Sequence, residues 1–184
     1  MAVSKILSGQ LVNLIPVTVE DAQFTMDIRN DEALTEFIPK IETTLEKQQN
    51  WVAGQREKDG DFFYIITKAD GTKLGTAAVY DVDSSNDICE FGRYISYGNA
   101  YENVETALLA LEYVFYELDI SCVMLNNDVR NKKIISFWKR FGAEFDAEYN
   151  YGTWTAARYL LTKKSFEEKC DKIKGLIEQG KRSI

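Results

Sequence analysis

Alternating apolar positions divide the first half of the chain into strands and short helices. Residues 11–17 alternate loosely and predict a first strand. Residues 18–21 and 43–46 each have the spacing of a helix-capping box, which predicts helices running to about Arg29 and to about Gly60. Two β-branched and aromatic runs flank Asp70-Gly71 and predict a hairpin over residues 62–67 and 74–82. A further strand is expected over residues 88–95.

The second half begins with an amphipathic pattern over residues 101–118, whose apolar residues recur at helical spacing. A strand follows at 120–125, and a short helix at 131–141 is closed by Gly142. Two more strands are expected at 144–149 and 153–162. Ser165 and Glu168 then form a capping box on a last helix. The order β-α-α-β-β-β-α-β-α-β-β-α is an α+β pattern with mixed strand pairing.

The length of 184 residues suits one domain with an additional terminal helix. No segment reaches the roughly 18 consecutive apolar residues of a membrane span, and the N-terminal residues lack the apolar core of a signal peptide. Three cysteines without paired spacing argue against a disulfide framework or a metal site. We therefore expect a cytoplasmic protein with no membrane partner and no metal.

Charge and histidine content narrow the chemistry further. The net charge of −7 argues against nucleic acid as a partner, because binding to a phosphate backbone needs a surplus of lysine and arginine. The chain contains no histidine, so Ser-His-Asp and Cys-His catalysis are excluded. Acid–base work would fall to a carboxylate with a raised pKa, a tyrosine, a cysteine, a lysine or water.

Several local sequences, in this order, resemble the GCN5-related N-acetyltransferase (GNAT) superfamily. They are Ile28-Arg29-Asn30-Asp31, Asn50-Trp51, Leu74-Gly75-Thr76, the strand Cys89-Glu90-Phe91-Gly92-Arg93-Tyr94, and the helix pattern from Asn131 through Phe137-Trp138 to Gly142. The resemblance implies a GNAT fold: a twisted mixed sheet of six to seven strands with two helices on each face. It covers about residues 10–165, and we expect one domain over residues 1–165 with a helical extension at 166–184.

The same resemblance implies acetyl-CoA as co-substrate and an N-acetyltransferase activity. Strands 88–95 and 120–125 should be neighbours that diverge, leaving backbone groups free to pair with pantetheine. Alternation along the first of these strands places Glu90, Gly92 and Tyr94 on one face. Glu90 aligns with the family's usual base, and Glu90 and Tyr94 are the catalytic candidates. The alternatives are a Glu90 ion pair at the sheet edge and a Tyr94 that only packs across strands.

The pyrophosphate loop departs from the family pattern, which places two glycines at the start of the central helix. Counting back from Leu118 puts Tyr101 and Asn103 at the glycine positions, with Glu102 between them, a charge unsuited to pyrophosphate. A shifted register, residues 98–100, gives Gly-x-Ala but starts the helix a turn early. Either the loop binds CoA in an atypical way, or CoA binding is weakened or lost; the plain alternative is an ordinary N-cap loop.

The remaining cofactor contacts follow from alignment with the family. The predicted set is Arg93, Ile95, Ala100, Tyr101, Asn103, Val104 and Asn131. Asn131 would also cap its helix. In the family, a tyrosine at the position of Trp138 acts as the general acid. An indole cannot protonate a thiolate, so Trp138 is expected to be a packing residue. The general acid would then be Tyr94, Tyr149, Tyr151 or water.

Arg29 and Asn30 end the first helix beside the expected acceptor cleft, where an arginine suits a phosphate or carboxylate. An exposed helix-end charge is the alternative for Arg29. The favoured acceptor is a small-molecule amine, in particular a nucleotide-linked amino sugar. A protein or peptide N-acetyltransferase and a GNAT-fold binding module without transferase activity are the other hypotheses. The last helix must bury its apolar stripe on its own domain or on a partner, and a homodimer is one such assembly.

Overall fold

A single mixed sheet runs through the computed structural model, which describes residues 5–182. The expectation about a signal peptide rests partly on Met1, which lies outside the described residues. The strands are β1 (Leu7–Ser8), β2 (Asn13–Pro16), β3 (Phe62–Thr67), β4 (Lys73–Asp83), β5 (Ile88–Ser96), β6 (Cys122–Asp128), β7 (Glu144–Asn150) and β8 (Thr155–Thr162). The helices are α1 (Ala22–Asn30), α2 (Leu45–Glu57), α3 (Ala100–Glu112), α4 (Lys132–Arg140) and α5 (Lys163–Lys181).

The strand order in space is β1-β2-β3-β4-β5-β6-β8-β7. Only β5 and β6 pair in parallel; every other neighbouring pair of described strands is antiparallel. The α+β class and the mixed pairing are confirmed. The predicted count of six to seven strands is one short, because the two-residue strand β1 is too brief to show an alternating pattern.

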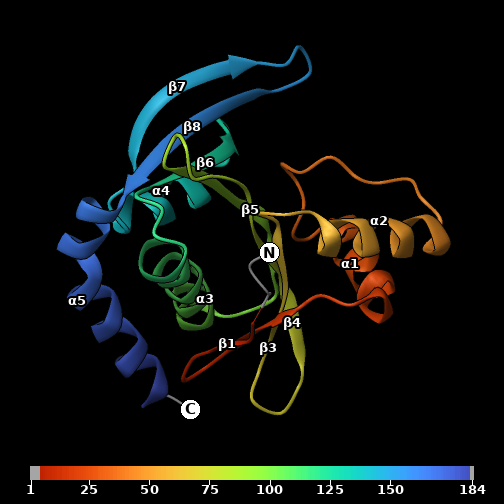
Figure 1. The fold of residues 1–184 in the computed structure, drawn as a ribbon, viewed down its shortest axis with the longest axis horizontal. Coiled ribbons are helices and arrows are strands. Elements are labelled where there is room, and N and C mark those ends of the chain that lie inside the picture. Colours follow the sequence, from red (N-terminus) through yellow and green to blue (C-terminus); the bar gives the residue numbers. More distant parts are fainter. Residues whose placement is uncertain (1–4, 183–184) are drawn as a thin grey trace.

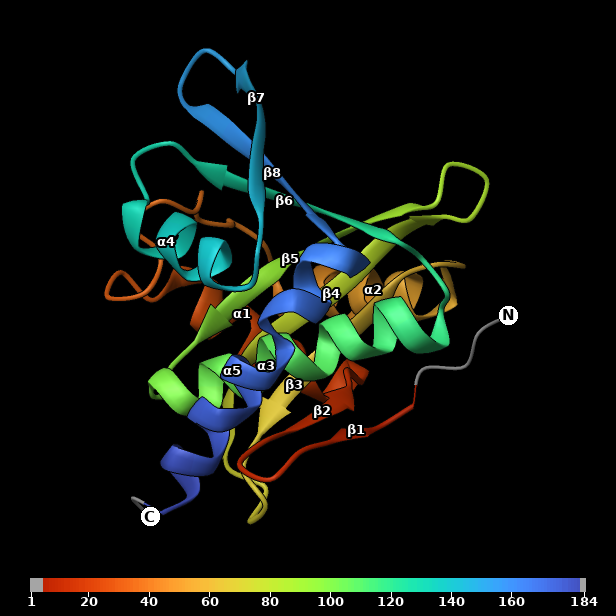
Figure 2. The same ribbon diagram turned by 90° about the vertical axis from the view of Figure 1, so that its left-hand side faces the viewer.

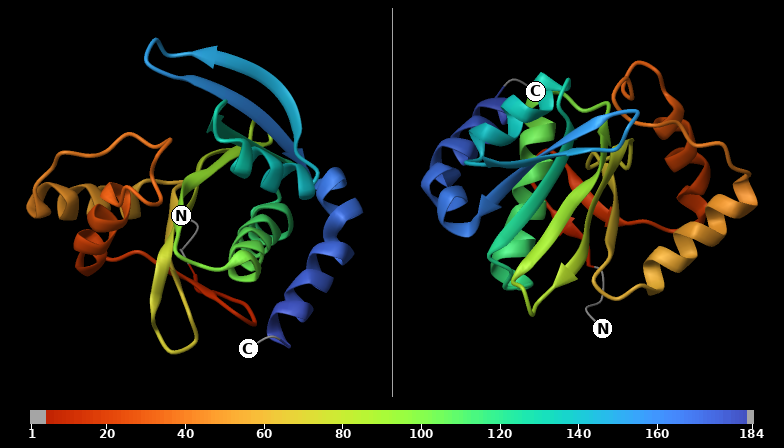
Figure 3. Two further views of the ribbon diagram at one scale, coloured as in Figure 1. Left: turned by 180° about the vertical axis from the view of Figure 1, so that it is seen from behind. Right: turned by 90° about the horizontal axis from the view of Figure 1, so that it is seen from above.

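Helices cover both faces of the sheet (Figure 1). Helices α1 and α2 lie on one face, whereas α3, α4 and α5 lie on the other, as the view from above in Figure 3 shows. The prediction of two helices on each face, with an additional C-terminal helix, is therefore confirmed, because α5 is the helix that joins α3 and α4 on the second face. Strands β7 and β8 form a curved arm that extends away from the sheet.

Strand β3 is buried along its whole length because helices cover it on both faces. The larger core cluster lies between the sheet and α3, α4 and α5, and includes Leu111, Phe115 and Trp138. A smaller cluster between the sheet and the α1–α2 layer contains Val17, Val52 and Phe63.

Helix ends follow local capping more than apolar periodicity. Helix α2 starts after Thr44, whose side chain accepts from the Lys47 N–H, as predicted, and ends at Glu57, earlier than Gly60. Helix α5 starts after Thr162 and not at the predicted Ser165. The Thr162 hydroxyl accepts from the Ser165 N–H and the Ser165 hydroxyl accepts from the Thr162 N–H, so Ser165 is the third residue of the helix.

The last helix packs on the chain's own core. Figure 2 shows α5 lying alongside α3. The ring of Phe166 lies 5.2 Å from that of Phe115, and Ile173 and Ile177 are buried. Gly180 lies against Tyr101 at the start of α3, where a Cβ on residue 180 would come within 2.5 Å of the ring. The two helices therefore run antiparallel, and the apolar stripe is covered without a partner.

None of the helices within residues 5–182 combines the length and apolar character that crossing a bilayer requires.

Candidate active site

A fork opens in the sheet where β5 and β6 separate. The two strands pair over Ile88–Cys122, Cys89–Val123 and Glu90–Met124, although β5 continues to Ser96 and β6 to Asp128. The predicted neighbours are thus confirmed, and so is their divergence. Beyond Glu90 and Met124 the facing backbone groups of these two strands have no cross-strand partner in the register. An extended chain with amide groups can pair with such exposed strand edges.

A bulge at Arg93 reverses the side-chain pattern along β5. Arg93 has φ +48°, and the register with β4 jumps from Ala78–Gly92 to Thr76–Ile95. Two residues of β5 therefore face one residue of β4, and alternation breaks. The prediction that Glu90, Gly92 and Tyr94 share a face is wrong for Tyr94. Its ring points to the α3–α4 face, whereas Glu90 lies on the α1–α2 face beside Tyr80.

A cleft of about 620 Å³ lies on the α1–α2 face. Helices α1 and α2, the loop between them, and strands β3, β4 and β5 supply its walls. The lining residues are Thr25, Arg29, Ile41, Glu42, Thr43, Lys47, Gln48, Trp51, Phe63, Thr76, Arg93 and Ile95. This volume suits a small molecule better than a folded protein segment.

Arg29 lines this cleft, and its neighbour Asn30 does not. The Arg29 Nε donates to the Pro39 carbonyl at 2.9 Å, and no ion pair among residues 5–182 involves Arg29. Burial lowers the pKa of Arg29 from its ordinary value, but a guanidinium stays protonated in proteins. The Asn30 amide instead exchanges two hydrogen bonds with the backbone of Ile41, at 3.0 and 3.1 Å, and so fixes the cleft wall.

Arg93 points into the cleft side of β5 and is neutralised there. Its guanidinium makes two hydrogen bonds to the buried Asp61, at 2.7 and 2.8 Å, and one to Gln55 at 3.0 Å. The same group lies 4.5 Å from the centre of the Tyr80 ring and 5.3 Å from that of Trp51. The predicted cofactor residue Arg93 thus has its side chain on the opposite face of β5 from Tyr94, in a rigid, aromatic-walled corner of the cleft.

Sequence reasoning missed Asp61 and Gln55, which hold Arg93. No pattern distinguishes Asp61 from the other acidic residues before strands. Gln48 was also missed, although a signal existed, because it precedes Val52 by four residues and so shares its buried helix face. The Gln48 amide donates to the Thr25 hydroxyl at 3.0 Å, which joins α1 and α2 at the cleft.

Glu90 accepts a hydrogen bond from the Tyr80 hydroxyl at 2.5 Å. Gly92 makes this contact possible, because a Cβ at position 92 would lie 2.5 Å from that hydroxyl. Burial raises the pKa of Tyr80 well above 10, and the Glu90 charge raises it further. Glu90 is half-buried and is not among the lining residues, so the pair lies beside the cleft, behind Arg93.

Tyr94 lies in an aromatic cluster at the fork, between α3 and α4. Its ring is 5.7 Å from that of Phe91 and 6.2 Å from that of Trp138, and its hydroxyl donates to the Asn103 carbonyl at 3.4 Å. Burial raises its pKa well above 10, so the phenol remains protonated. Trp138 is 2% exposed, which confirms it as a packing residue.

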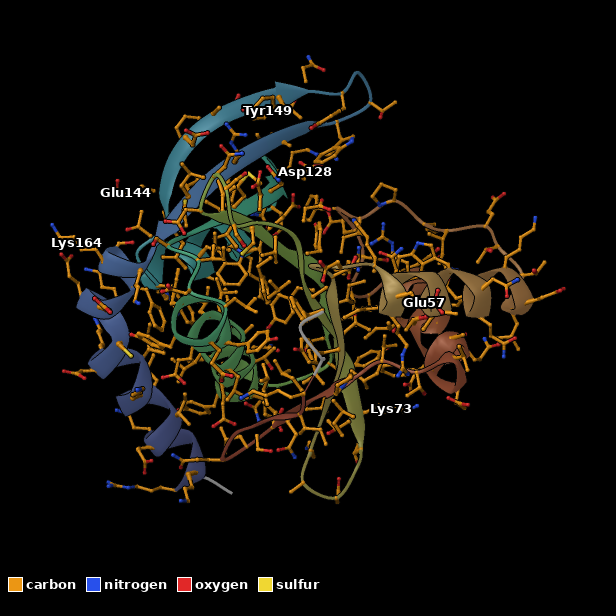
Figure 4. The ribbon with its side chains drawn as sticks, in the orientation of Figure 1. Glu57, Lys73, Asp128, Glu144, Tyr149 and Lys164 are labelled. Carbon is orange, nitrogen blue, oxygen red and sulfur yellow. The ribbon has the colours of Figure 1, made fainter. Side chains whose placement is uncertain are left out.

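The other two tyrosines considered as acids lie far out on the arm. Figure 4 shows Tyr149 on β7, in the curved arm, away from α1 and α2. Tyr149 packs against Arg158, and Tyr151 is 61% exposed and stacks on Trp154.

The start of α3 is closed by the chain's own side chains. The helix begins at Ala100, so residues 98–100 and not 101–103 form its entry. The Asn99 side chain accepts from the N–H groups of Tyr101 and Glu102, and the Glu102 carboxylate accepts from the Asn99 N–H at 2.7 Å. Asn99 therefore caps the helix, and the shifted register, Gly98-Asn99-Ala100, is the one that coincides with the start of α3. Glu102 is 5% exposed and pairs with Lys68 at 3.4 Å.

The remaining predicted cofactor residues are scattered around the fork. Ala100 is exposed, Tyr101 packs under Gly180, and Val104 packs on the core. Ile95 lines the cleft instead. Asn131 caps α4, since its side-chain oxygen accepts from the Ile134 N–H at 3.2 Å.

The fit to acetyl-CoA is divided between its two halves. The unpaired edges of β5 and β6 match the amide groups of a pantetheine arm, and Asn103 Oδ1 is a buried acceptor without a partner among the described residues. The diphosphate fits the start of α3 poorly, because the N–H donors of Asn99, Tyr101 and Glu102 are occupied there and the Glu102 carboxylate lies in the first turn. No group of three potential metal ligands occurs among residues 5–182.

The acetyltransferase (GNAT) domain family matches residues 12–144 of this chain. No curated protein matches the chain significantly. Among solved structures, the chain is similar to "Apo FdhC- a nucleotide-linked sugar GNAT", with a TM-score of 0.81, 24% identity, and coverage of 95% of this chain and 98% of that one. A GCN5-related N-acetyltransferase from Brucella melitensis has a TM-score of 0.78 and 16% identity, with coverage of 94% and 85%.

A chimera of the spermidine N-acetyltransferase SpeG from Vibrio cholerae with hSSAT is similar as well. Its TM-score is 0.76 at 14% identity, covering 86% of this chain and 99% of that one. At these identities the structures establish the fold, and they leave the acceptor open.

Proposed function

Since the chain belongs to the GNAT acetyltransferase family and is an acyltransferase, we propose that it acetylates the amine of a small anionic molecule, in the first instance a nucleotide-linked amino sugar. Arg29 carries this proposal. It is a cation with no acidic partner among the described residues, half-buried in the cleft that the acceptor would enter. A desolvated guanidinium binds phosphate or carboxylate strongly.

The walls of the cleft support the same acceptor class. Trp51 and Phe63 offer aromatic faces, which suit the rings of a nucleoside or sugar. Lys47 adds a second cation, Glu42 is the only acidic lining residue, and the charge of Arg93 is already neutralised by Asp61. A polycation such as spermidine would meet a net positive wall, which disfavours it.

The proposed chemistry places a base and an acid on opposite faces of β5. The amine nitrogen attacks the thioester carbonyl carbon, a C–N bond forms, and the C–S bond then breaks. The amine proton passes to Glu90 through the Tyr80 hydroxyl or ordered water, because Glu90 lies behind the cleft wall. Tyr94, on the fork side, gives its proton to the departing thiolate. The bulge at Arg93 supports this division, because it turns Glu90 and Tyr94 to different faces.

The test is a panel of amines assayed with acetyl-CoA: nucleotide-linked amino sugars, spermidine and a peptide with a free N-terminus. We expect transfer to the amino sugar, and Arg29→Gln should raise its KM by roughly tenfold to a hundredfold with a smaller change in kcat. Lys40→Gln is the control, since Lys40 is an exposed lysine of the same loop and is paired with Glu32. Preference for spermidine or the peptide, or an unchanged KM in Arg29→Gln, would overturn the proposed acceptor class.

A further inference from the structure

The entry to α3 has almost no free donors. Within residues 98–103, the Gly98 N–H donates to the Ser96 hydroxyl and the Asn103 N–H to the Asn99 carbonyl, at 2.9 and 3.0 Å. The N–H groups of Asn99, Tyr101 and Glu102 donate within the capping box. A phosphate bound at a helix N-terminus needs these same groups as donors. The Asn103 N–H makes the ordinary first bond of the helix, and the N–H groups of Gly98, Asn99, Tyr101 and Glu102 have local partners, so only the Ala100 N–H of this entry has no partner among the described residues.

One carboxylate at this end of the helix opposes an anion. The Glu102 carboxylate stands in the first turn and is nearly buried, so solvent screens it weakly. The C-terminal turn of α5 lies against the same turn of α3 through Gly180 and Tyr101. The negative end of the α5 dipole therefore offsets the positive end of the α3 dipole. Nearby cations are Lys68, which is paired with Glu102, and Lys181 and Arg182, which are exposed.

The adjoining fork between β5 and β6, in contrast, has hydrogen-bonding groups without cross-strand partners among the described strands. The unpaired edges of β5 and β6 offer donors and acceptors to an arm that contains amides. The Asn103 side chain donates to the Gly98 carbonyl at 2.8 Å, which fixes its orientation and leaves Oδ1 as a buried acceptor without a partner among residues 5–182. A buried acceptor without a donor is costly, and a pantetheine amide N–H is a donor of the right kind.

We propose that this site recognises its acyl donor through the pantetheine arm alone and does not hold the diphosphate of CoA at the start of α3. Thioesters of pantetheine that lack the nucleotide are then donors of similar quality to acetyl-CoA. The kinetic test of this inference rests on the proposed acetyl transfer, whereas the binding test does not. Glu102 and Asn99 are the residues that set this donor specificity.

The experiment compares acetyl-CoA with S-acetylpantetheine in the wild-type protein. We expect kcat/KM values within about tenfold of each other, and dissociation constants of CoA and pantetheine, from calorimetry, within the same factor. A preference for the CoA compounds of more than about a hundredfold in both measurements would overturn the inference.

A charge-only variant separates Glu102 from the rest of the loop. Glu102→Gln keeps an oxygen that accepts from the Asn99 N–H and removes the negative charge. CoA affinity should rise several-fold, while pantetheine affinity stays unchanged. Glu112→Gln, on the same helix and paired with Lys174, should change neither. A loss of CoA affinity in Glu102→Gln would contradict the inference, because Glu102 would then support phosphate binding.

The two proposals fail differently. If acetyl-CoA is a donor and S-acetylpantetheine is not, the acetyltransferase function stands and the inference falls. If both thiols bind equally but neither thioester acetylates any amine, the inference about recognition stands and the proposed function falls. If neither thiol binds, both fall.

Discussion

At the level of single residues, the bulge at Arg93 turns Glu90 towards the acceptor-cleft face of β5 and Tyr94 towards the fork. Strict alternation along β5 would have placed Glu90 and Tyr94 together, and only the positive φ of Arg93 separates them. Arg93 is held there by Asp61, which directly precedes β3, by Gln55 of α2, and by three aromatic rings from α2, β3 and β4. These contacts join Arg93 to residues that are distant in the sequence, so no local pattern in the strand predicts the bulge.

Glu90→Gln tests the proposed base. The amide keeps the shape and can still accept from Tyr80, but it cannot take a proton. We expect kcat/KM for the amine to fall by about 10²–10⁴-fold, with thiol affinity nearly unchanged. Steady-state kinetics and calorimetry measure the two quantities, and Glu148→Gln on the exposed arm is the control. Activity within a factor of about two of wild type would assign Glu90 a structural role.

At the level of elements, a carboxylate on α3 fixes the N-terminal hairpin. Glu105 is 3% exposed and accepts from the backbone N–H groups of Gln10, Leu11 and Val12 at 2.6–2.8 Å. These bonds hold the turn between β1 and β2, which the sequence did not predict because its partner lies about 95 residues away. The other strands and helices were predictable from periodicity and capping residues, which are local.

Glu105→Gln should destabilise the protein by about 1–3 kcal/mol, because the new amide NH₂ replaces one of the acceptors that the buried backbone donors use. Urea unfolding gives the free energy of unfolding. Glu112→Gln breaks only a half-exposed pair with Lys174 and should cost less than about 1 kcal/mol. Equal losses in the two variants would show that the three backbone contacts contribute little.

The loop over residues 31–44 forms one wall of the cleft and reaches both sides of the fork. The Tyr97 hydroxyl, just after β5, donates to Asp31, and Arg130, between β6 and α4, lies over the Phe37 ring at 5.6 Å. Tyr97→Phe removes one of these attachments. We expect the acceptor KM to rise several-fold while the thiol dissociation constant stays the same. Equal effects on donor and acceptor binding would show that the loop is not specific to the acceptor side.

At the level of the whole molecule, three tyrosines, of which Tyr64 is buried and Tyr80 and Tyr94 are half-buried, set an alkaline limit to stability. Burial is the main cause that raises the pKa values of Tyr64, Tyr80 and Tyr94 above their ordinary 10.0. In the unfolded chain they ionise near pH 10, whereas in the folded protein they stay protonated. Their contribution is therefore complete below pH 10 and is lost as the pH rises beyond it.

We expect the free energy of unfolding to fall above pH 10 by about 1.4 kcal/mol per pH unit for each such tyrosine. Thermal or urea unfolding at several pH values measures this slope. Tyr64→Phe should reduce the slope by one tyrosine's share and leave the stability near pH 8 less affected. A slope that is identical in the variant would show that Tyr64 ionises equally well in the folded state.

The overall topology was predictable because the motifs and the element order are local and ordered along the chain. The fork lies at the one parallel pair of described strands in an otherwise antiparallel sheet, as the family resemblance implied. The cleft was not predictable, since it is built from α1, α2, a loop and three strands that meet only in the fold. The sequence identified Glu102 as a charge unsuited to pyrophosphate at the start of α3. Only the structure shows that Glu102 and Asn99 form a capping box there.

The most direct measurement of the central claim is a transfer assay that follows thiol release and acetylated product together, with acetyl-CoA and a nucleotide-linked amino sugar. We expect equal amounts of free thiol and acetylated sugar nucleotide, and a dependence of the rate on Arg29 at low acceptor concentration. Thiol release without acetylated product, or no transfer to any amine in the presence of bound acetyl-CoA, would contradict it.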